Sequence, residues 1–482
     1  MKILLASSET VPYSKTGGLA DMVGALAKFL ARAGHEVGLV TPLYRGIRAR
    51  FPDIQPFDWR LDLPLGAATV SGAVLTRQTE PGLTVYFIDH PGYFDRNGIY
   101  NDHSVDYPDN PERFIFFSKA VVHLARYLPW QPQVINVHDW PTALVPALVR
   151  EERVSGRWPN AARVCLTIHN LAYQGNFPGT TFPLTNLPPS YLQPDGLEYY
   201  TYMNCLKGGI AYADLLTTVS PRYAREITTE LYGCGLDGAL RRRQGDLVGI
   251  LNGVDYDEWK TVDNPYLAAS YTAQDLAGKA ANKAALQKEV GLPLAPNVPL
   301  FGAVSRLADQ KGMDIQLGAL EEMLAANLQF VLLGSGDREY ERGYRKLAER
   351  HPGKCAVKIG FDTGLSHRIE AGCDFQLMPS RFEPCGLNQM YSLRYGAIPI
   401  VRLTGGLDDT VIDYTENQIQ PDGIKFTEYS ARALAKAMRK ALALYADADL
   451  LTAFRQNGMA RDFSWERTAQ AYAQVYERML AS

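Results

Sequence analysis

The sequence predicts an α/β protein made of two doubly wound domains, each with a parallel β-sheet between layers of helices. Short apolar runs alternate with segments of helical spacing in the first half of the chain, and the alternation restarts beyond about residue 296. Strands that alternate with helices are typical of a parallel sheet covered on both faces. A chain of 482 residues has room for two or three domains of ordinary size.

The first half begins with a strand, a helix and a second strand. Residues 3–5 form a short apolar run, apolar residues recur at helical spacing over 19–30, and Gly34 suits the position just after a helix. Further apolar runs, separated by polar or helical segments, predict strands over residues 37–40, 84–88, 134–137 and 164–168.

The second half has the more regular pattern. It predicts a helix over residues 313–326 and strands over residues 300–304, 330–333, 356–359, 375–378 and 398–401. Residues 252–299 contain an Asn-Gly turn and a polar helical stretch, which are typical of a linker or a domain edge. We therefore expect a first domain over residues 1–250 and a second over 251–459, followed by an amphipathic helix.

The composition is that of a folded soluble protein. Hydrophobic residues make up 46% of the chain and charged residues 21%, and the net charge is −3 without a long run of either sign. We therefore expect no nucleic-acid partner and no membrane partner. The N-terminal apolar run is too short for a signal peptide, so a cytoplasmic protein is expected, and the six cysteines have neither metal-like nor disulfide spacing.

Ligands of open α/β sheets bind beyond the carboxyl ends of the strands, where the N-termini of helices favour anions. Residues 15–18, Lys-Thr-Gly-Gly, lie at such a place in the first half and combine a cation with two glycines that allow close approach. Arg306 and Lys311 follow the first strand of the second half, and two cations there suit a diphosphate. The residues alone leave open the alternative that both places are solvated turns.

The segment over residues 380–389 is the densest candidate site. Glu383 and Gly386 lie between a predicted buried strand and a predicted helix, where the glutamate could face a ligand or simply cap the helix. His138 and His169 each follow a predicted strand, which places both at one edge of the first sheet. The alternative for a histidine in such a place is a packing role.

Other short motifs carry less weight. Residues 16–19, Thr-Gly-Gly-Leu, recur at 404–407, where paired glycines again permit close approach. Residues 255–257, Asp-Tyr-Asp, match a pattern that can hold a divalent metal, but no further ligand completes it and a structural role is favoured. Residues 334–337 begin like a dinucleotide fingerprint but lack its third glycine, so they predict a turn. No metal and no cofactor is expected.

Taken together, the motifs resemble those of the bacterial glycogen synthases and plant-type starch synthases, which are retaining glucosyltransferases. The likeness covers nearly the whole chain and is carried by residues 15–21, 137–140, 167–175, 305–312, 379–389 and 404–407. The resemblance implies the GT-B fold, in which two Rossmann-like domains face a deep interdomain cleft and the helix of about residues 460–482 packs back on the first domain.

The resemblance also implies the reaction and the residues that carry it. Glucose would pass from a nucleotide sugar, ADP-glucose in bacterial members, to the non-reducing end of an α-1,4-glucan with retained anomeric configuration, so that glycogen is elongated. The implied catalytic residues are Glu383, His169, Lys15, Arg306 and Lys311. The cations would neutralise the diphosphate, Glu383 would bind glucose hydroxyls or orient Lys311, and the backbone carbonyl of His169 would lie beneath the anomeric carbon.

The ligand contacts implied by the resemblance come from both halves of the chain. The ring of Phe361 would stack on the base, Asp21 would support the loop of Lys15, and backbone amides of residues 386–387 would hold phosphate. The implied donor-binding residues are Lys15, Gly17, Gly18, Asp21, Asn252, Arg306, Lys311, Phe361, Cys385, Gly386 and Leu387. The implied acceptor or cleft residues are His138, Asp139, Trp140 and Tyr173.

Two positions depart from the family pattern. Tyr391 stands where many retaining transferases of this fold have a second glutamate, which puts the ribose contact in doubt, and Asn388 stands where many bacterial members have threonine. No pair of carboxylates of the glycosidase kind is evident. The resemblance implies instead a front-face displacement, in which the departing phosphate helps to take the acceptor proton. The alternatives are a UDP-glucose-using α-glucan synthase of the same fold, a glycogen phosphorylase, a non-catalytic two-domain sugar-binding protein and an NAD-linked dehydrogenase.

Overall fold

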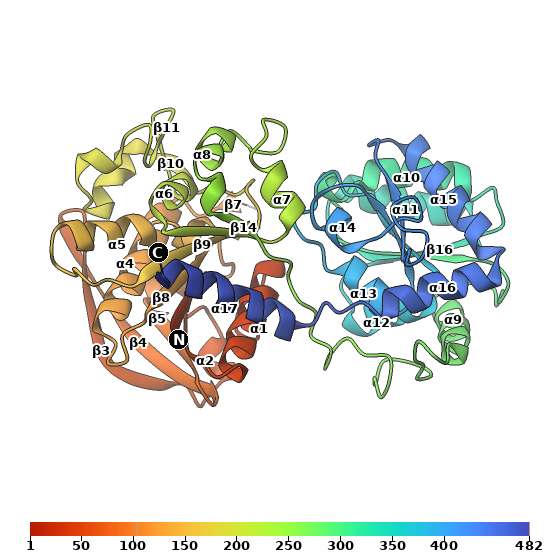
Figure 1. The fold of residues 1–482 in the computed structure, drawn as a ribbon, viewed down its shortest axis with the longest axis horizontal. Coiled ribbons are helices and arrows are strands. Elements are labelled where there is room, and N and C mark those ends of the chain that lie inside the picture. Colours follow the sequence, from red (N-terminus) through yellow and green to blue (C-terminus); the bar gives the residue numbers. More distant parts are fainter. Residues whose placement is uncertain (104, 482) are drawn as a thin grey trace. The chain divides into compact units, whose positions relative to one another are not determined.

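The computed structural model describes residues 1–103 and 105–481, which divide into two compact units (Figure 1). Unit 1 comprises Met1–Gly253 and the C-terminal segment that begins at Trp465, and unit 2 comprises Val254–Ser464. Each unit contains one large β-sheet with helices packed on it. No helix in the two described ranges is long and apolar enough to cross a membrane.

The main sheet of unit 1 has nine strands in the order β14-β13-β9-β8-β1-β2-β5-β4-β3. β1 pairs with β2 on one side and with β8 on the other, both in parallel. The carboxyl ends of β1 and β8 therefore flank the point where the strand order reverses, which is the usual ligand position in such sheets. The parallel strands are β1 (Lys2–Ala6), β2 (Glu36–Pro42), β5 (Leu83–Asp89), β8 (Val134–His138), β9 (Arg163–Ile168), β13 (Leu215–Thr218) and β14 (Leu247–Gly249).

The far edge of this sheet corrects one sequence prediction. β3 (Gln55–Leu65) and β4 (Ala68–Glu80) form an antiparallel hairpin that joins β5, so the sheet is mixed and not parallel throughout. The sequence predicted polar or helical segments here. The buried Leu61 and Leu63 of β3 alternate with exposed residues, so no continuous apolar run marks the strand. That alternation is typical of an antiparallel edge with one face in water.

Helices cover the sheet of unit 1, and the chain returns to this unit at its end. α1 (Gly18–Arg32) follows β1, and α17 (Trp465–Ala481) packs against it (Figure 1). The rings of Phe29 and Trp465 are stacked with their centroids 6.3 Å apart. The hydroxyl of Tyr476 donates a hydrogen bond to Asn136 Oδ1 in β8 at 2.8 Å, which ties α17 to the middle of the sheet.

The other elements of unit 1 connect and cover these parts. The remaining α-helices are α2 (Ile47–Arg50), α3 (Pro91–Phe94), α4 (Asn110–Tyr127), α5 (Val145–Val154), α6 (Cys205–Tyr212), α7 (Pro221–Glu226) and α8 (Asp237–Arg242). The minor strands are β6 (Asn101–Asp102), β7 (Val105–Asp106), β10 (Asn176–Pro178), β11 (Glu198–Tyr199) and β12 (Tyr202–Asn204). The 3₁₀ helices are η1 (Trp140–Thr142), η2 (Gly179–Thr185), η3 (Pro189–Tyr191) and η4 (Gln244–Asp246).

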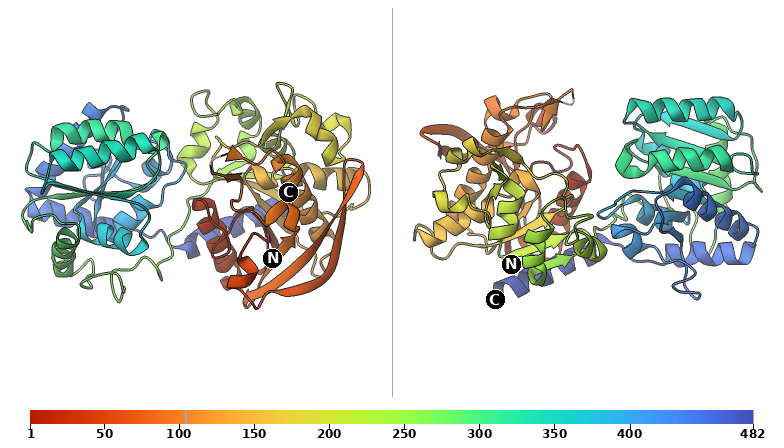
Figure 2. Two further views of the ribbon diagram at one scale, coloured as in Figure 1. Left: turned by 180° about the vertical axis from the view of Figure 1, so that it is seen from behind. Right: turned by 90° about the horizontal axis from the view of Figure 1, so that it is seen from above.

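Unit 2 has a six-stranded sheet that is parallel throughout, in the order β17-β16-β15-β18-β19-β20. Phe330 and Leu332 of β16 enter one buried cluster, whereas Val331 and Leu333 enter the cluster on the opposite face. Figure 2 shows helices on both faces of this sheet, as its apolar strands require. The strands are β15 (Leu300–Val304), β16 (Gln329–Gly334), β17 (Cys355–Ile359), β18 (Phe375–Met378), β19 (Ile398–Arg402) and β20 (Ile424–Phe426).

The helices of unit 2 are α9 (Ala277–Glu289), η5 (Asp309–Lys311), α10 (Met313–Met323), α11 (Arg338–Arg350), α12 (Thr363–Gly372), α13 (Asn388–Arg394), α14 (Gly405–Thr410), α15 (Ala431–Tyr445) and α16 (Ala448–Met459). The helices alternate with the strands, except that α9 precedes the first strand and both α15 and α16 follow the last. The strands predicted from apolar runs in both halves of the chain are confirmed, and so is the doubly wound fold class.

The segment expected as a linker, residues 252–299, belongs from Val254 onward to unit 2 and contributes to its interior. The ammonium group of Lys279 is buried and donates to the carbonyls of Ala371 and Tyr395, each at 3.0 Å. Lys283 is also buried and forms an ion pair with Asp374 at 2.7 Å. The sequence did not predict this role, because lysines are mostly exposed and only their hydrogen-bond partners show that these two are buried.

Candidate functional site

A buried carboxylate organises the first candidate loop, which follows β1 in unit 1. Glu9 is 3% exposed, and its carboxylate accepts hydrogen bonds from the backbone N–H groups of Thr16 and Gly17 and from the Thr16 hydroxyl. The hydroxyl of Tyr100 donates to the same carboxylate at 2.9 Å. In the described part of the chain, a Cβ built on Gly17 or Gly18 would meet no atom within 4 Å. The loop is thus held in place while its glycines face open space.

Lys15 and Asp21 are brought together at the start of α1. Lys15 Nζ lies 2.7 Å from Asp21 Oδ1, and both side chains are partly exposed. An acidic residue in the first turn also suits the positive end of the helix dipole. The pair fixes the direction of the Lys15 side chain over the helix N-terminus.

Strained backbone marks the loop after β8. Asp139 has φ +55° and ψ −174°, a region that residues with a side chain rarely adopt. Its buried carboxylate accepts the backbone N–H of His169 at 2.7 Å. Burial raises the pKa of Asp139 to about 7, backbone hydrogen bonds act against this rise, and the charge of Glu9 adds to it. Glu9, Asp139 and His169 therefore form one cluster at the switch point of the sheet.

Two histidines contact each other in this cluster. Nδ1 of His138 lies 3.0 Å from Nε2 of His169, and the rings are tilted by 37°. Burial lowers the pKa of His169 to about 3, and it lowers the pKa of His138 well below its usual value. Both imidazoles are therefore neutral at neutral pH.

The other predicted residues of unit 1 differ in burial and contacts. The ring of Trp140 packs on Phe114 at 4.9 Å, and a Cβ on Gly175 would come within 2.6 Å of the same ring. Tyr173 is exposed, whereas Asn252 is buried and its Oδ1 finds no hydrogen-bond partner in residues 1–103 and 105–481.

The central feature of unit 2 is an ion pair beyond β15 and β18, the strands where the order of its sheet reverses. Lys311 Nζ lies 2.5 Å from Glu383 Oε2, and the Ser380 hydroxyl donates to the same oxygen at 3.0 Å. Glu383 is 5% exposed. The N-cap position of α13 is taken by Leu387 and not by Glu383, so the glutamate holds the lysine and does not cap the helix.

The second Thr-Gly-Gly-Leu segment packs directly on the Glu383 loop. Gly406 N donates to the carbonyl of Glu383 at 3.0 Å. A Cβ on Gly405, which has φ +45°, would lie 1.9 Å from that carbonyl oxygen, and a Cβ on Gly406 would lie 2.0 Å from the Cys385 oxygen. These glycines serve backbone packing, unlike Gly17 and Gly18, so the two similar segments have different local roles.

The remaining predicted residues of unit 2 are spread around the same sheet edge. Arg306 is exposed and forms a long hydrogen bond of 3.4 Å to Gln310. Phe361 is 88% exposed after β17, while Cys385 is buried and Gly386 has φ +72°. The ring of Tyr391 stacks face to face on Trp259 at 3.6 Å. The side chain of Asn388 donates to the carbonyl of Val304 in β15.

Sequence reasoning missed Glu9 and Tyr100, and it gave Ser380 no role of its own within the candidate segment over residues 380–389. Glu9 comes shortly after the predicted strand over residues 3–5, and this placement was the available signal. Tyr100 offered no signal, since its role rests on its contact with Glu9, and the role of Ser380 is evident only in its contact with Glu383. Among the described residues, no group of three or more histidines, cysteines or carboxylates is placed to hold a metal ion.

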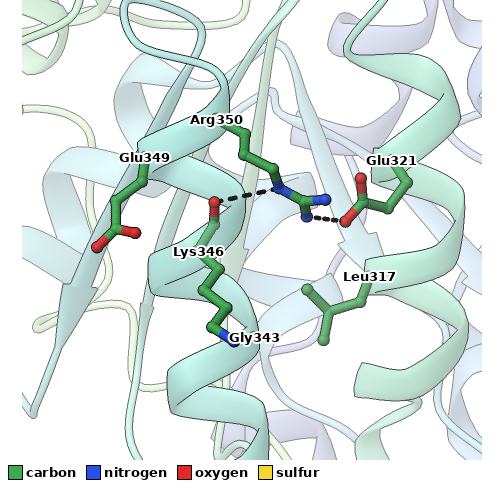
Figure 3. A pocket seen from close by; sticks show the side chains of 6 residues that line it. All are labelled: Leu317, Glu321, Gly343, Lys346, Glu349 and Arg350. Atoms are coloured by element: carbon green, nitrogen blue, oxygen red, sulfur yellow. Dashed lines mark hydrogen bonds and ion pairs between the residues drawn. The ribbon is translucent and has the colours of Figure 1, made fainter.

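A cavity of about 330 Å³ lies between α10 and α11 (Figure 3). Arg350 bridges it by donating to Glu321 and to the carbonyl of Lys346. Both Glu321 and Arg350 lie near the C-terminal ends of their helices, which return toward the amino ends of the strands. Within the described ranges, the cavity is lined by these two helices alone and shares no residue with the loops of Lys311 and Glu383.

Comparison with known proteins identifies the class of this chain. Residues 2–242 match the family model described as the starch synthase catalytic domain, and residues 287–461 match the model described as glycosyl transferases group 1. The catalytic domain of Starch Synthase IV from Arabidopsis thaliana, solved bound to ADP and acarbose, is 32% identical with a TM-score of 0.90 and covers 100% of this chain and 99% of its own. A sucrose-phosphate synthase from Thermosynechococcus elongatus, 19% identical with a TM-score of 0.64 and 99% coverage of both chains, shares the fold. The protein is a glycosyltransferase of two Rossmann-like domains.

Relatives similar over their whole length define the family more narrowly. The glycogen synthase of Anaeromyxobacter sp. (strain Fw109-5) is 47% identical over 100% of both chains. The glycogen synthase of Koribacter versatilis (strain Ellin345) is 46% identical over 99% of this chain and 98% of its own. Glycogen synthase 2 of Geobacter sulfurreducens is 42% identical over 100% of this chain and 99% of its own. The chain belongs to the glycogen synthase family, which confirms the resemblance and the enzyme class predicted from the sequence.

Proposed function

We propose that this chain transfers glucose from ADP-glucose to the non-reducing 4-hydroxyl of an α-1,4-glucan with retained anomeric configuration, and so elongates glycogen. The observation that carries the proposal is the Lys311–Glu383 ion pair beyond the carboxyl ends of β15 and β18. Such an edge is where α/β sheets bind nucleotides. The similar starch synthase solved with ADP and acarbose supports an adenine nucleotide and a glucan-like ligand.

The donor contacts in unit 2 follow from charge and exposure. The ammonium group of Lys311 would neutralise the diphosphate as it leaves, and Arg306, whose guanidinium is exposed, would add a second cation. The exposed ring of Phe361 offers a flat surface for the base. The backbone of residues 385–387, between Glu383 and α13, would approach the phosphates closely at Gly386.

The residues of unit 1 would contact the donor sugar and the acceptor. Lys15 with the open glycine loop would face phosphate and sugar, and Asp21 would hold the lysine in that direction. The backbone carbonyl of His169 would stabilise positive charge at the anomeric carbon, and Asp139 would lie on the acceptor side. Tyr173, which is exposed, would add a surface for glucose rings.

The ion pair also bears on the mechanism. Glu383 Oε2 is engaged by Lys311 and Ser380, which disfavours Glu383 as a nucleophile at the anomeric carbon. We therefore propose a front-face displacement, in which the bond from C1 to the diphosphate oxygen breaks, the bond from C1 to the acceptor oxygen forms, and the departing diphosphate takes the acceptor proton. No glucosyl-enzyme forms in this scheme, and trapping one on any side chain would refute it.

The test is a coupled assay of nucleotide release with ADP-glucose and UDP-glucose in parallel, with and without maltoheptaose. The variants are Glu383→Ala and Lys15→Ala, and Lys346→Ala at the cavity of Figure 3 is the matched surface control. We expect acceptor-dependent release from ADP-glucose that is lost in the first two variants and kept in the control. Preferred release from UDP-glucose would overturn the donor assignment, and release without acceptor would overturn the transfer to a glucan.

A further inference from the structure

His138 and His169 share a single hydrogen bond whose direction the surrounding contacts decide. Nδ1 of His138 and Nε2 of His169 are 3.0 Å apart, so one nitrogen carries the proton and the other accepts it. His138 is fully buried, and its second nitrogen, Nε2, finds no hydrogen-bond partner among the described residues. The two possible directions therefore leave different groups of His138 unsatisfied.

The first direction places the proton on His138 Nδ1. Nε2 of His138 is then a bare lone pair, and the free proton of His169 must be on Nδ1, because its Nε2 accepts. The second direction places the shared proton on His169 Nε2. Nε2 of His138 must then carry a proton too, which buries an N–H donor without an acceptor. Orphaned buried N–H groups are rarer than unsatisfied acceptors, so the first direction is favoured.

The backbone around both rings fixes this contact. The hydroxyl of Thr142 accepts the backbone N–H of His138 at 2.8 Å and donates to the carbonyl of His138 at 2.9 Å. The carboxylate of Asp139 holds the backbone N–H of His169. Burial keeps the pKa of both imidazoles below neutral pH, so the two rings share one proton as neutral groups.

We infer that His138 is a positioning residue, which holds His169 in the tautomer that carries its proton on Nδ1. His169 then offers a hydrogen-bond donor to a ligand oxygen through Nδ1, and that nitrogen has no lone pair with which to remove a proton from an acceptor hydroxyl. The tautomer follows from the histidine contact and the buried Nε2 of His138, whereas its effect on glucose transfer rests on the proposed function. His138, although expected on the acceptor side, acts through His169 because it is buried.

The test uses the full chain with ¹⁵N-labelled histidine and compares the ring nitrogen signals at neutral pH. The chain has eight histidines, and the variant His169→Gln assigns the signals of His169 by their loss. We expect a protonated Nδ1 and a bare Nε2 for His169 in the unaltered chain. In His138→Phe, which keeps an aromatic ring but removes the shared hydrogen bond, we expect a substantial fraction of the Nε2-protonated form. A protonated Nε2 in the unaltered chain, or an unchanged spectrum in His138→Phe, would overturn the inference.

A matched control separates this effect from general loss of packing. His123→Phe makes the same substitution in unit 1, where the His123 ring packs against Trp59 and Tyr127, and should leave the His169 signals unchanged. The rate of acceptor-dependent nucleotide release should fall about two- to tenfold in His138→Phe, the effect of one hydrogen bond, but not in the control. If the unaltered chain releases no nucleotide, the proposed function fails, but the spectra still decide the tautomer, because the assignment by His169→Gln does not depend on activity.

Discussion

Gly405→Ala tests whether the second Gly-Gly pair fixes the position of Glu383. Gly405 has φ +45°, and a Cβ there would lie 1.9 Å from the carbonyl oxygen of Glu383 and 2.9 Å from its carbon. These are backbone atoms, so the contact cannot be relieved by turning a side chain. The loop that carries Glu383 must move away from α14, and the Lys311–Glu383 pair must change its geometry.

The expected loss of stability has two parts. A residue with a Cβ at positive φ is destabilised by about 1–2 kcal/mol, and the overlap with the Glu383 loop adds about 1–3 kcal/mol. Gly291→Ala isolates the first part, because Gly291 has φ +75° and a Cβ there meets nothing within 4 Å in the part of the chain that the structure describes. The difference between the two variants is therefore the energy of the close contact. A displacement of about 1 Å at Glu383 should also lower kcat/KM by about 100-fold.

The assay must report on unit 2 alone, because a chain of two units need not unfold in one step. Trp259 is the sole tryptophan between residues 254 and 464, so urea unfolding followed by ¹⁹F signals of fluorotryptophan gives a separate transition for this unit. Nucleotide release measured on the same preparations gives kcat/KM. Equal stability and equal activity of Gly405→Ala and Gly291→Ala would refute the view that α14 holds the Glu383 loop through backbone contact.

Three further predictions concern charged groups. Lys311→Met leaves the Glu383 carboxylate buried without its cation. Urea unfolding should show a loss of unfolding free energy smaller than the about 3–5 kcal/mol of a fully buried pair, because Lys311 is 20% exposed. Adding Glu383→Leu should restore the stability but not the nucleotide release. The pKa of His169 is about 3 in the folded chain and 6.5 in the unfolded chain, so the unfolded chain binds more protons below pH 6.5. The free energy of unfolding should therefore decrease as the pH is lowered below 6.5, by up to about 1.4 kcal/mol per pH unit. This slope, measured by urea unfolding between about pH 4 and 7, should be smaller in His169→Gln, and an unchanged slope would contradict the assignment. Glu9→Gln can keep an amide oxygen toward the N–H groups of Thr16 and Gly17, but it removes the negative charge and places an NH2 group where Oε1 accepts from the hydroxyls of Thr16 and Tyr100. We expect the weaker hydrogen bonds to lower nucleotide release about tenfold, and unaltered kinetics would contradict a role for the Glu9 charge in holding the loop.

The sequence by itself determined the parallel strands of the two sheets and the edges where chemistry can occur, but not the antiparallel hairpin of β3 and β4. The runs over residues 300–304 and 330–333 are continuously apolar because their strands are buried on both faces, and they were read correctly for that reason. Ligand-binding groups follow the carboxyl ends of parallel strands, so the rule that located Lys311 and Glu383 needed only the chain order. Family-specific motifs then defined the enzyme class.

Only the tertiary structure decided which side chains work together. The pairing of Lys311 with Glu383 and of His138 with His169 joins residues from different strand ends, and strand order sets which ends are neighbours. Burial also changes the role of a residue type. Lys279, a residue expected at the surface, is buried and its ammonium group donates hydrogen bonds to three backbone carbonyls. A local pattern records propensity and periodicity, whereas hydrogen-bond partners and desolvation arise only when distant segments meet.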